Sequence, residues 1–427
     1  MKIKFIMSII MFMINASLII IITSDFSTLI IFSILTILVI LIDKKSYNHI
    51  LLFLIGSLTV IIVFYYWNIF FGNSYFMGRT SDDQQYDFLW SYDYLDKYGI
   101  SPFHLLKHLG PLHNSPGYVY VIIILRYISD ILGGVYHTLT PRFLNIYFLL
   151  LIAKYSSEIV WYYTKNKKYK TYTLFSIFLY PVMLFNSAHV FRDTIISFIL
   201  VFIYYIMIIE KSQLKKILSI ILSLLTLFYF RLGTLMVSVM IITYLMLSNR
   251  RKGVIFVFLS GTLLLIGSYY YFANEWNRLF SQIEMYKSLN VERKGSMGSA
   301  IYRLPFFISI VPKITYFIIT PTPKMLPAYQ FFQSIAVYIK LLFIPFMMIG
   351  ITSKYIDIKL KVVFAILFLA VVLTTGTFRH VMMYIPFGMM ITIIYLHYHK
   401  FRLTNKVILS FGILFSMISF SLILITF

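Results

Sequence analysis

Carboxylates are scarce in this chain, and two of them stand together in an aromatic loop where they could act in catalysis. The sequence has 15 Asp and Glu residues against 37 Lys and Arg residues, and Asp82 and Asp83 are adjacent in the segment from Ser81 to Asp87. A carboxylate beside a hydroxyl group can take its proton as a general base. Asp82 and Asp83 are therefore the candidate catalytic residues, and the sequence does not choose between them.

The candidate binding residues are mostly arginines that stand at the ends of apolar segments. Arginine binds phosphate through a planar, bidentate fork of N–H donors. A few carboxylates facing several guanidinium groups suit a diphosphate better than an inorganic cation. The set comprises Arg192, Asp193, Arg231, Arg303, Arg379, His380 and His113.

The elements that must position these residues are membrane-spanning helices. Hydrophobic residues make up 60% of the chain and charged residues 12%, which leaves too little polar surface for a soluble protein of this size. About 20 apolar residues span a bilayer as a helix, and this criterion predicts roughly 12 to 15 helices. We expect an all-α, polytopic integral membrane protein, with a single transmembrane helical domain over residues 1–427 and no separate soluble domain. Its first apolar segment, Phe5 to Thr23, is expected to be a retained helix, because no small-residue cleavage site follows it.

Basic residues between the apolar segments indicate how the helices are oriented. The net charge is +22, but the lysines and arginines fall in short clusters, as they do in the cytoplasmic loops of membrane proteins. These clusters need no nucleic acid as a partner, and they place the N-terminus in the cytoplasm. They are Lys44-Lys45, Lys165 to Lys170, Lys211 to Lys216, Arg250 to Lys252, Lys354 to Lys361 and Lys400 to Lys406.

The same count requires one or two segments that do not cross the membrane fully. If every apolar segment crossed, basic clusters such as Lys165 to Lys170 would lie outside, against the charge rule. Pro116 to Tyr136 and Leu304 to Thr320 are the segments expected to be half-spanning, re-entrant or interfacial. The two larger outer loops are then residues 72–115 and 274–303, and the candidate site residues all fall at the outer face.

Several candidate residues also have a plain structural interpretation. Asp82 and Asp83 could cap a helix from Tyr86 to Tyr98, and this role does not exclude catalysis. Asp193 could cap the helix that follows it, and Arg231 could reach the membrane surface from the tip of a tight hairpin. His113 fits a turn.

Metal and nucleophile sites have little support in the sequence. There is no cysteine, which excludes disulfides, thiolate ligands and cysteine nucleophiles, and no zinc spacing or glycine-rich phosphate loop is present. Asp82 and Asp83 could bind Mg²⁺ or Mn²⁺ through a diphosphate, while the arginines could neutralise the same charge. A cofactor is therefore not specified, and the metal question stays open.

Short motifs in the first half resemble membrane glycosyltransferases of the GT-C superfamily. The motifs are Asp82-Asp83 with Tyr86 and Gly99, then Pro111-Leu112, Ser115-Pro116-Gly117-Tyr118 and Pro141-Arg142-Phe143-Leu144-Asn145. The second half is more similar to bacterial O-antigen and capsule repeat-unit polymerases, in its many spans, its late outer loop and its outer-face arginines Arg192, Arg303 and Arg379.

These resemblances imply a glycosyltransferase of surface-polysaccharide biosynthesis in the bacterial cytoplasmic membrane. The donor would be a sugar on a polyprenyl phosphate or diphosphate, and Asp82 or Asp83 would inherit the role of catalytic base. The polymerase version joins lipid-linked repeat units, acts among membrane lipids and would work beside a chain-length regulator or other assembly proteins. Two alternatives are a transferase that moves one sugar from polyprenyl phosphate to a glycan or lipid, and a transporter or flippase for lipid-linked glycans.

Overall fold

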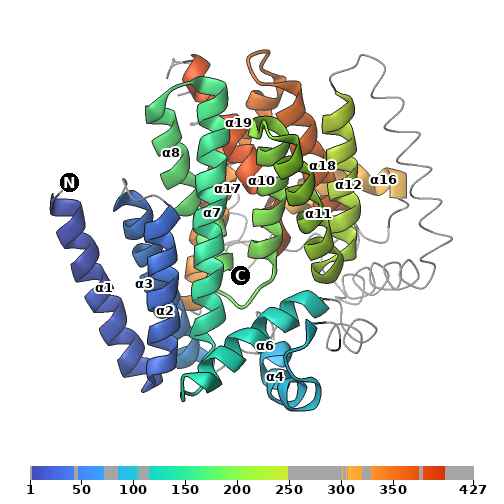
Figure 1. The fold of residues 1–427 in the computed structure, drawn as a ribbon. Coiled ribbons are helices and arrows are strands. Elements are labelled where there is room, and N and C mark those ends of the chain that lie inside the picture. The colour runs from blue at the N-terminus through green and yellow to red at the C-terminus, as the bar shows by residue number, and fades with distance from the viewer. Residues whose placement is uncertain are drawn as a thin grey trace.

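The computed structural model describes residues 2–42, 47–71, 85–102, 104, 115–248, 301, 304, 306–319, 328–374 and 378–399. Within these ranges every regular element is a helix, which confirms the all-α class, and Figure 1 shows most of the helices side by side. They are α1 (Lys2–Thr23), α2 (Phe26–Ile42), α3 (Tyr47–Phe71), α4 (Gln85–Tyr98), α6 (Pro116–Ile131), α7 (Leu139–Thr164), α8 (Lys167–Phe178), α9 (Pro181–Ser187), α10 (Asp193–Ile209), α11 (Gln213–Phe230), α12 (Leu232–Leu247), α16 (Phe306–Ile319), α17 (Ala328–Thr352), α18 (Ile358–Thr374), the 3₁₀ helix η1 (Phe378–Met383) and α19 (Ile385–His399).

Four of these helices are long enough and apolar enough to cross a membrane. They are the stretches Ile3–Thr23, Tyr47–Tyr65, Leu139–Thr164 and Gln213–Phe230. In α1 and α11 only 17% of the most apolar stretch is buried, so most of their Ile, Leu and Phe side chains face outward. Exposed apolar surface on this scale is what hydrocarbon covers in a membrane protein. The full count of roughly 12 to 15 spans stays a prediction from hydropathy.

Side-chain contacts define two opposite ends of the bundle. At one end, the Tyr163 hydroxyl lies 2.9 Å from the Tyr204 hydroxyl, which joins the last turns of α7 and α10. At the other end, Arg142 Nη1 in the first turn of α7 donates to the Ala188 carbonyl, just before α10, at 2.8 Å. The helices α7 and α10 are therefore parallel, and the segments that contact their termini can be assigned to one end or the other.

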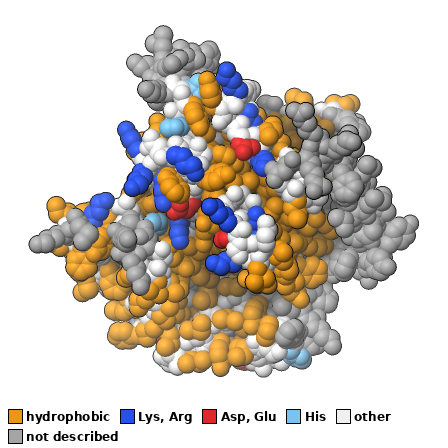
Figure 2. Space-filling model, turned by 45° about the horizontal axis from the view of Figure 1, so that its top comes forward, with side chains coloured by type: hydrophobic (Ala, Val, Ile, Leu, Met, Phe, Trp, Pro, Cys, Tyr) orange, Lys and Arg blue, Asp and Glu red, His pale blue; other side chains and the backbone are white. Residues whose placement is uncertain are grey.

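Lysines gather at the first of these ends, which we call the lysine end and define by Lys165, Lys170, Lys216 and Lys361. Lys170 pairs with Glu158 in the last turns of α7 at 2.6 Å, and Lys216 donates to the Met207 carbonyl near the end of α10. Figure 2 shows Lys and Arg side chains across the face that corresponds to the top of Figure 1, bordered by hydrophobic surface. The described basic clusters thus share one end of the bundle, as the positive-inside pattern predicts.

The helix α6 lies across the opposite end instead of along the bundle (Figure 1). At its start, Gly117 lies against Phe230 at the end of α11, close enough that an added Cβ would be 2.7 Å from that ring. Near its end, the Ser129 hydroxyl lies 2.6 Å from that of Ser27 at the start of α2. Both contacts are at the same end of the bundle, so α6 runs along it, as an interfacial Pro116 to Tyr136 segment would.

The apolar stretch Thr171 to Ala188, which hydropathy counts as one of the predicted spans, belongs to two helices, α8 and α9. The chain leaves α8 at Phe178, and α9 begins at Pro181 after Tyr180 takes an extended conformation with ψ 117°. Proline has no backbone N–H to continue a helix, and its ring disfavours helical dihedral angles in the residue before it. Hydropathy averages over such a break and therefore does not detect it.

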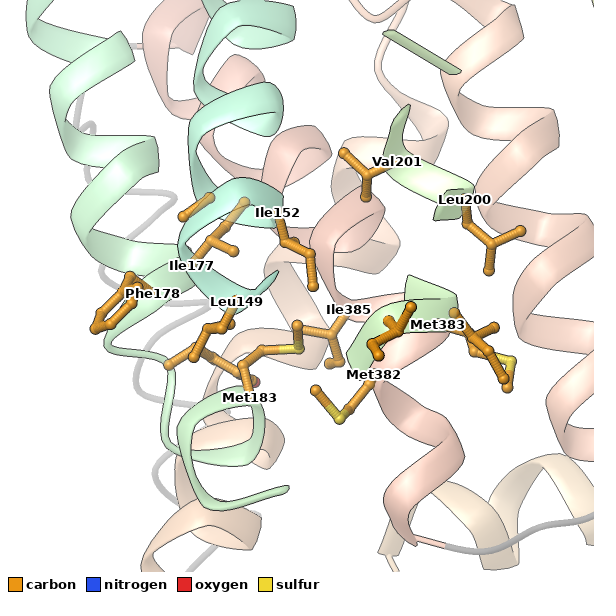
Figure 3. Packing of buried hydrophobic residues seen from close by; sticks show 14 of the residues in the cluster. Leu149, Ile152, Ile177, Phe178, Met183, Leu200, Val201, Met382, Met383 and Ile385 are labelled. Carbon is orange, nitrogen blue, oxygen red and sulfur yellow. The ribbon is translucent and has the colours of Figure 1, made fainter. Parts of the chain in front are cut away.

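One hydrophobic core joins the helices that carry the candidate site. Leu149 of α7 and Met183 of α9 are fully buried in it, together with Met382 of η1 and Ile385 of α19. Figure 3 shows these side chains together in the core, between the helices that carry them. Segments that are almost 200 residues apart in sequence, such as α10 and η1, are packed against each other in this way.

Candidate functional site: an arginine cluster around Asp193

The carboxylate of Asp193, the first residue of α10, is buried among basic side chains at the end opposite the lysines. Its side chain is 1% exposed. Arg231 Nη1 lies 3.2 Å from Oδ1, His380 Nε2 lies 3.5 Å from Oδ1, and Arg379 Nε lies 3.7 Å from Oδ2. We call Arg192, Asp193, Arg231, Arg379 and His380 the arginine cluster, and their end of the bundle the arginine end.

Arg231, Arg379 and His380 reach Asp193 from points where a helix ends or begins. Arg231 is the single extended residue (φ −169°) between α11 and α12, and its side chain is 16% exposed. The Arg231 side chain turns inward and forms an ion pair with Asp193, and its role in binding stays a prediction. Arg379 and His380 lie in η1, the 3₁₀ helix that precedes α19.

Asp193 does not serve as a helix cap. The N-cap position of α10 is Arg192, and no side-chain cap hydrogen bond is formed there. A carboxylate in the first turn still interacts favourably with the helix dipole. The main interaction of Asp193 is nonetheless with the arginines from other segments.

The arginine cluster carries an excess of positive charge. Burial and the neighbouring Arg231, Arg379 and Arg192 hold the pKa of His380 well below its usual value, so this histidine is neutral at physiological pH. Three guanidinium cations then face one carboxylate within the described residues. Guanidinium groups bind phosphate or carboxylate ligands through several N–H donors in a planar fork. The chemistry that this arrangement supports is the binding of a phosphate-containing anion.

The structure thus brings together five of the predicted site residues. Four others lie outside the described residues: Asp82 and Asp83, proposed as catalytic, and His113 and Arg303, proposed to bind substrate. Their roles stay predictions. The possible Mg²⁺ or Mn²⁺ site at Asp82 and Asp83 also lies outside the described residues. The described part of the chain has no group of three metal-ligating side chains.

Ser197 positions η1 against α10, a role that sequence reasoning missed. Ser197 lies one helical turn after Asp193 and is fully buried. Its hydroxyl donates to the Met382 carbonyl at 2.7 Å, which fixes η1, and with it Arg379 and His380, beside Asp193. The four-residue spacing from Asp193 places both side chains on one face of α10. This spacing is the sequence signal that could have identified Ser197 as a positioning residue.

Two buried side chains of α7 bind the backbone that leads into Asp193, and they too were missed as site residues. Asn145 Nδ2 donates to the carbonyls of His189 and Phe191 at 2.7 and 3.0 Å. Arg142 Nη1 donates to the Ala188 carbonyl at 2.8 Å. Both residues belong to the motif Pro141 to Asn145, which carries part of the family resemblance. The sequence therefore pointed to these two residues, but it did not indicate what they do.

The comparisons with known proteins do not assign the chain to a family. No family model matches it, and neither the curated proteins nor the solved structures include a significant match.

Proposed function

We propose that this protein is a membrane glycosyltransferase of bacterial surface-polysaccharide biosynthesis that uses polyprenyl-(di)phosphate-linked sugar donors at the outer face of the cytoplasmic membrane. The preferred version is an O-antigen or capsule repeat-unit polymerase. The arginine cluster around Asp193 is the observation that supports the proposal. It gathers one buried and two half-buried arginines where the headgroup of a lipid-linked substrate would meet the protein.

In the proposed reaction, the arginine cluster holds the diphosphate of the donor. Donors that face charge developing on a leaving group stabilise the transition state, and such interactions are among the largest in catalysis. Arg192, Arg231 and Arg379 would neutralise the diphosphate as the sugar carbon leaves it. Asp82 or Asp83 would take the proton from the acceptor hydroxyl as that oxygen forms the new glycosidic bond.

The sidedness in this proposal rests on the separation of charge between the two ends. Lysines occupy one end of the bundle, and the arginine cluster occupies the other. Cytoplasmic loops are enriched in lysine and arginine, so the lysine end would face the cytoplasm. The arginine cluster would then face outward, where lipid-linked repeat units are joined.

Single-cysteine labelling tests this orientation without interference, because the natural chain has no cysteine. We expect Ser101→Cys, at an exposed position near α6, to react with a membrane-impermeant maleimide in intact spheroplasts. Lys211→Cys, exposed at the lysine end, should react only after the membrane is permeabilised. The reverse pattern would place the arginine cluster in the cytoplasm and contradict the proposed site of reaction.

The function itself is tested by deleting the gene and restoring variants. We expect deletion to abolish long surface glycans and to leave single lipid-linked repeat units on the outer leaflet. The natural protein and the control Lys215→Ala, an exposed change at the lysine end, should restore the long chains, whereas Arg192→Ala should not. Unchanged glycan length in the deletion strain would refute the polymerase assignment, and loss of one terminal sugar would favour the single-sugar transferase.

A transporter or flippase is the second candidate, and one residue favours it. Lys340 lies near the middle of α17 and is fully buried, and charged groups inside apolar helices often mark transport paths. In the deletion experiment a flippase would leave its lipid-linked precursor on the cytoplasmic leaflet. The arginine cluster, however, gathers its charges at one end of the bundle, which suits a reaction at one membrane face.

A further inference from the structure

The backbone between α9 and α10 depends on another helix for its hydrogen bonds. Residues 188–192 are not in a regular helix, and the side chains of Ala188 and His189 are buried. Buried carbonyl groups need hydrogen-bond partners, and non-helical backbone at membrane depth is tolerated only where protein or a wet cavity supplies them. Within this segment, one backbone bond runs from Phe191 N–H to the His189 carbonyl.

Asn145 and Arg142 supply hydrogen bonds to this segment from α7. Asn145 is 0% exposed and uses one amide nitrogen for two carbonyls, those of His189 and Phe191. Arg142 is 1% exposed and donates to Ala188. Two side chains three residues apart on one face of α7 thus bind three carbonyls in a stretch of four residues.

The bound carbonyls stand directly before two members of the arginine cluster. Phe191 is bonded covalently to Arg192, and Asp193 follows. The Arg379 guanidinium, which belongs to η1, also lies over the Phe191 ring, 5.4 Å from its centre. Phe191 therefore contacts the arginine cluster through its ring as well as through its backbone. Any shift of the Phe191 backbone would therefore displace Arg192, Asp193 and the ring beneath Arg379 together.

We propose that Arg142 and Asn145 are positioning residues, which hold residues 188–191 so that the arginine cluster can bind the phosphate groups of its substrate. They do not touch the substrate, and they act through the backbone of the segment. The proposal deepens the proposed function and rests on it for the identity of the bound group. A displacement of about 1 Å at a binding group can lower a rate about 100-fold, so such support has a measurable effect.

The test compares two buried asparagines with the same substitution. Asn145→Asp keeps the shape of the side chain but removes its amide donor. Asn186→Asp is the matched control, because Asn186 is equally buried at 1% exposure and donates to Val182 within its own helix. Both changes bury a carboxyl group, so their difference isolates the contacts to His189 and Phe191.

Two measurements are made on the detergent-purified full chain. Hydrogen–deuterium exchange of peptides that cover residues 188–192 should rise about tenfold in Asn145→Asp relative to Asn186→Asp, because one donor that holds two carbonyls is lost. The dissociation constant for inorganic pyrophosphate should rise about tenfold in the same comparison. Equal exchange or equal affinity in the two variants would overturn the positioning role.

A second variant covers the case in which Asn145→Asp does not fold. Arg142→Lys keeps the charge but loses the planar fork, and it should raise exchange at Ala188 and weaken pyrophosphate binding in the same direction. If the natural protein does not bind pyrophosphate, the proposed function fails. The exchange measurement still decides whether Arg142 and Asn145 hold the segment, so the two failures are distinguishable.

Discussion

Replacing Asp193 by asparagine is expected to lower the free energy of unfolding by about 3–5 kcal/mol, because it leaves the largely enclosed cations around it without this carboxylate. Asp193 is 1% exposed and contacts Arg231, Arg379 and His380. Asparagine preserves the volume but supplies no negative charge. The remaining guanidinium groups would repel one another across a site with little access to water. The expected readouts are a lower melting temperature and a lower yield of monodisperse protein.

The matched control for this change is Asp130→Asn. Asp130 also pairs with an arginine, since its Oδ2 lies 3.4 Å from Arg126 Nε, but its side chain is 42% exposed. An ion pair whose carboxylate is largely in water contributes about 0–1 kcal/mol, so the control should change the melting temperature little. A small effect of Asp193→Asn as well would contradict the view that this carboxylate holds the cluster together.

The double variant Asp193→Asn with Arg231→Met separates charge from packing. If the loss of stability comes from uncompensated positive charge, removing one arginine should restore part of it. If Asp193 acts mainly through local packing at the start of α10, the second substitution should add a further loss. The free energy of unfolding of the two single variants and of the double variant should therefore be measured, and the sign of their coupling energy distinguishes the two explanations.

Counting charged clusters along the sequence predicts one common face for the candidate site residues, and the members that the structure describes lie at one end of the bundle. Each crossing reverses the side of the chain, so Arg192, Arg231 and Arg379 were expected at one face although they are far apart in sequence. Their convergence on Asp193 agrees with that expectation. The count also identified Pro116 to Tyr136 as one of two segments expected to be half-spanning, re-entrant or interfacial, and its helix α6 lies across the end of the bundle.

The supports of the cluster could not be predicted in the same way. Asn145 and Ser197 are buried polar residues inside apolar helices, and hydropathy treats them as small interruptions. Their roles depend on which backbone carbonyls lie opposite, namely those of Phe191 and Met382, and only the packing of α7, α10 and η1 determines this. The break before Pro181 was missed for a related reason, because an averaged window does not register the conformation of one residue.

The two contacts of Arg379, with the Phe191 ring and with Asp193, require a planar, charged side chain. Its guanidinium lies over the Phe191 ring, and its Nε faces Asp193 Oδ2. A planar guanidinium can stack on a ring and donate in its own plane at once, whereas an ammonium group cannot. Arginine and lysine are therefore not equivalent at this position.

Arg379→Lys should lower the rate of sugar transfer about 100-fold or more, because a donor to the developing phosphate charge is misplaced. The fold should persist, since the positive charge beside Asp193 is kept. Arg126→Lys is the matched control, because Arg126 also stacks on a ring, that of Tyr92, and pairs with a carboxylate, that of Asp130, but lies outside the cluster. Both variants should melt near the natural protein, while only Arg379→Lys should lose transfer in an assay with lipid-linked donor and acceptor. Near-natural transfer by Arg379→Lys would mean that charge alone is needed there, and that only Arg192 and Arg231 could recognise a diphosphate in a bidentate way.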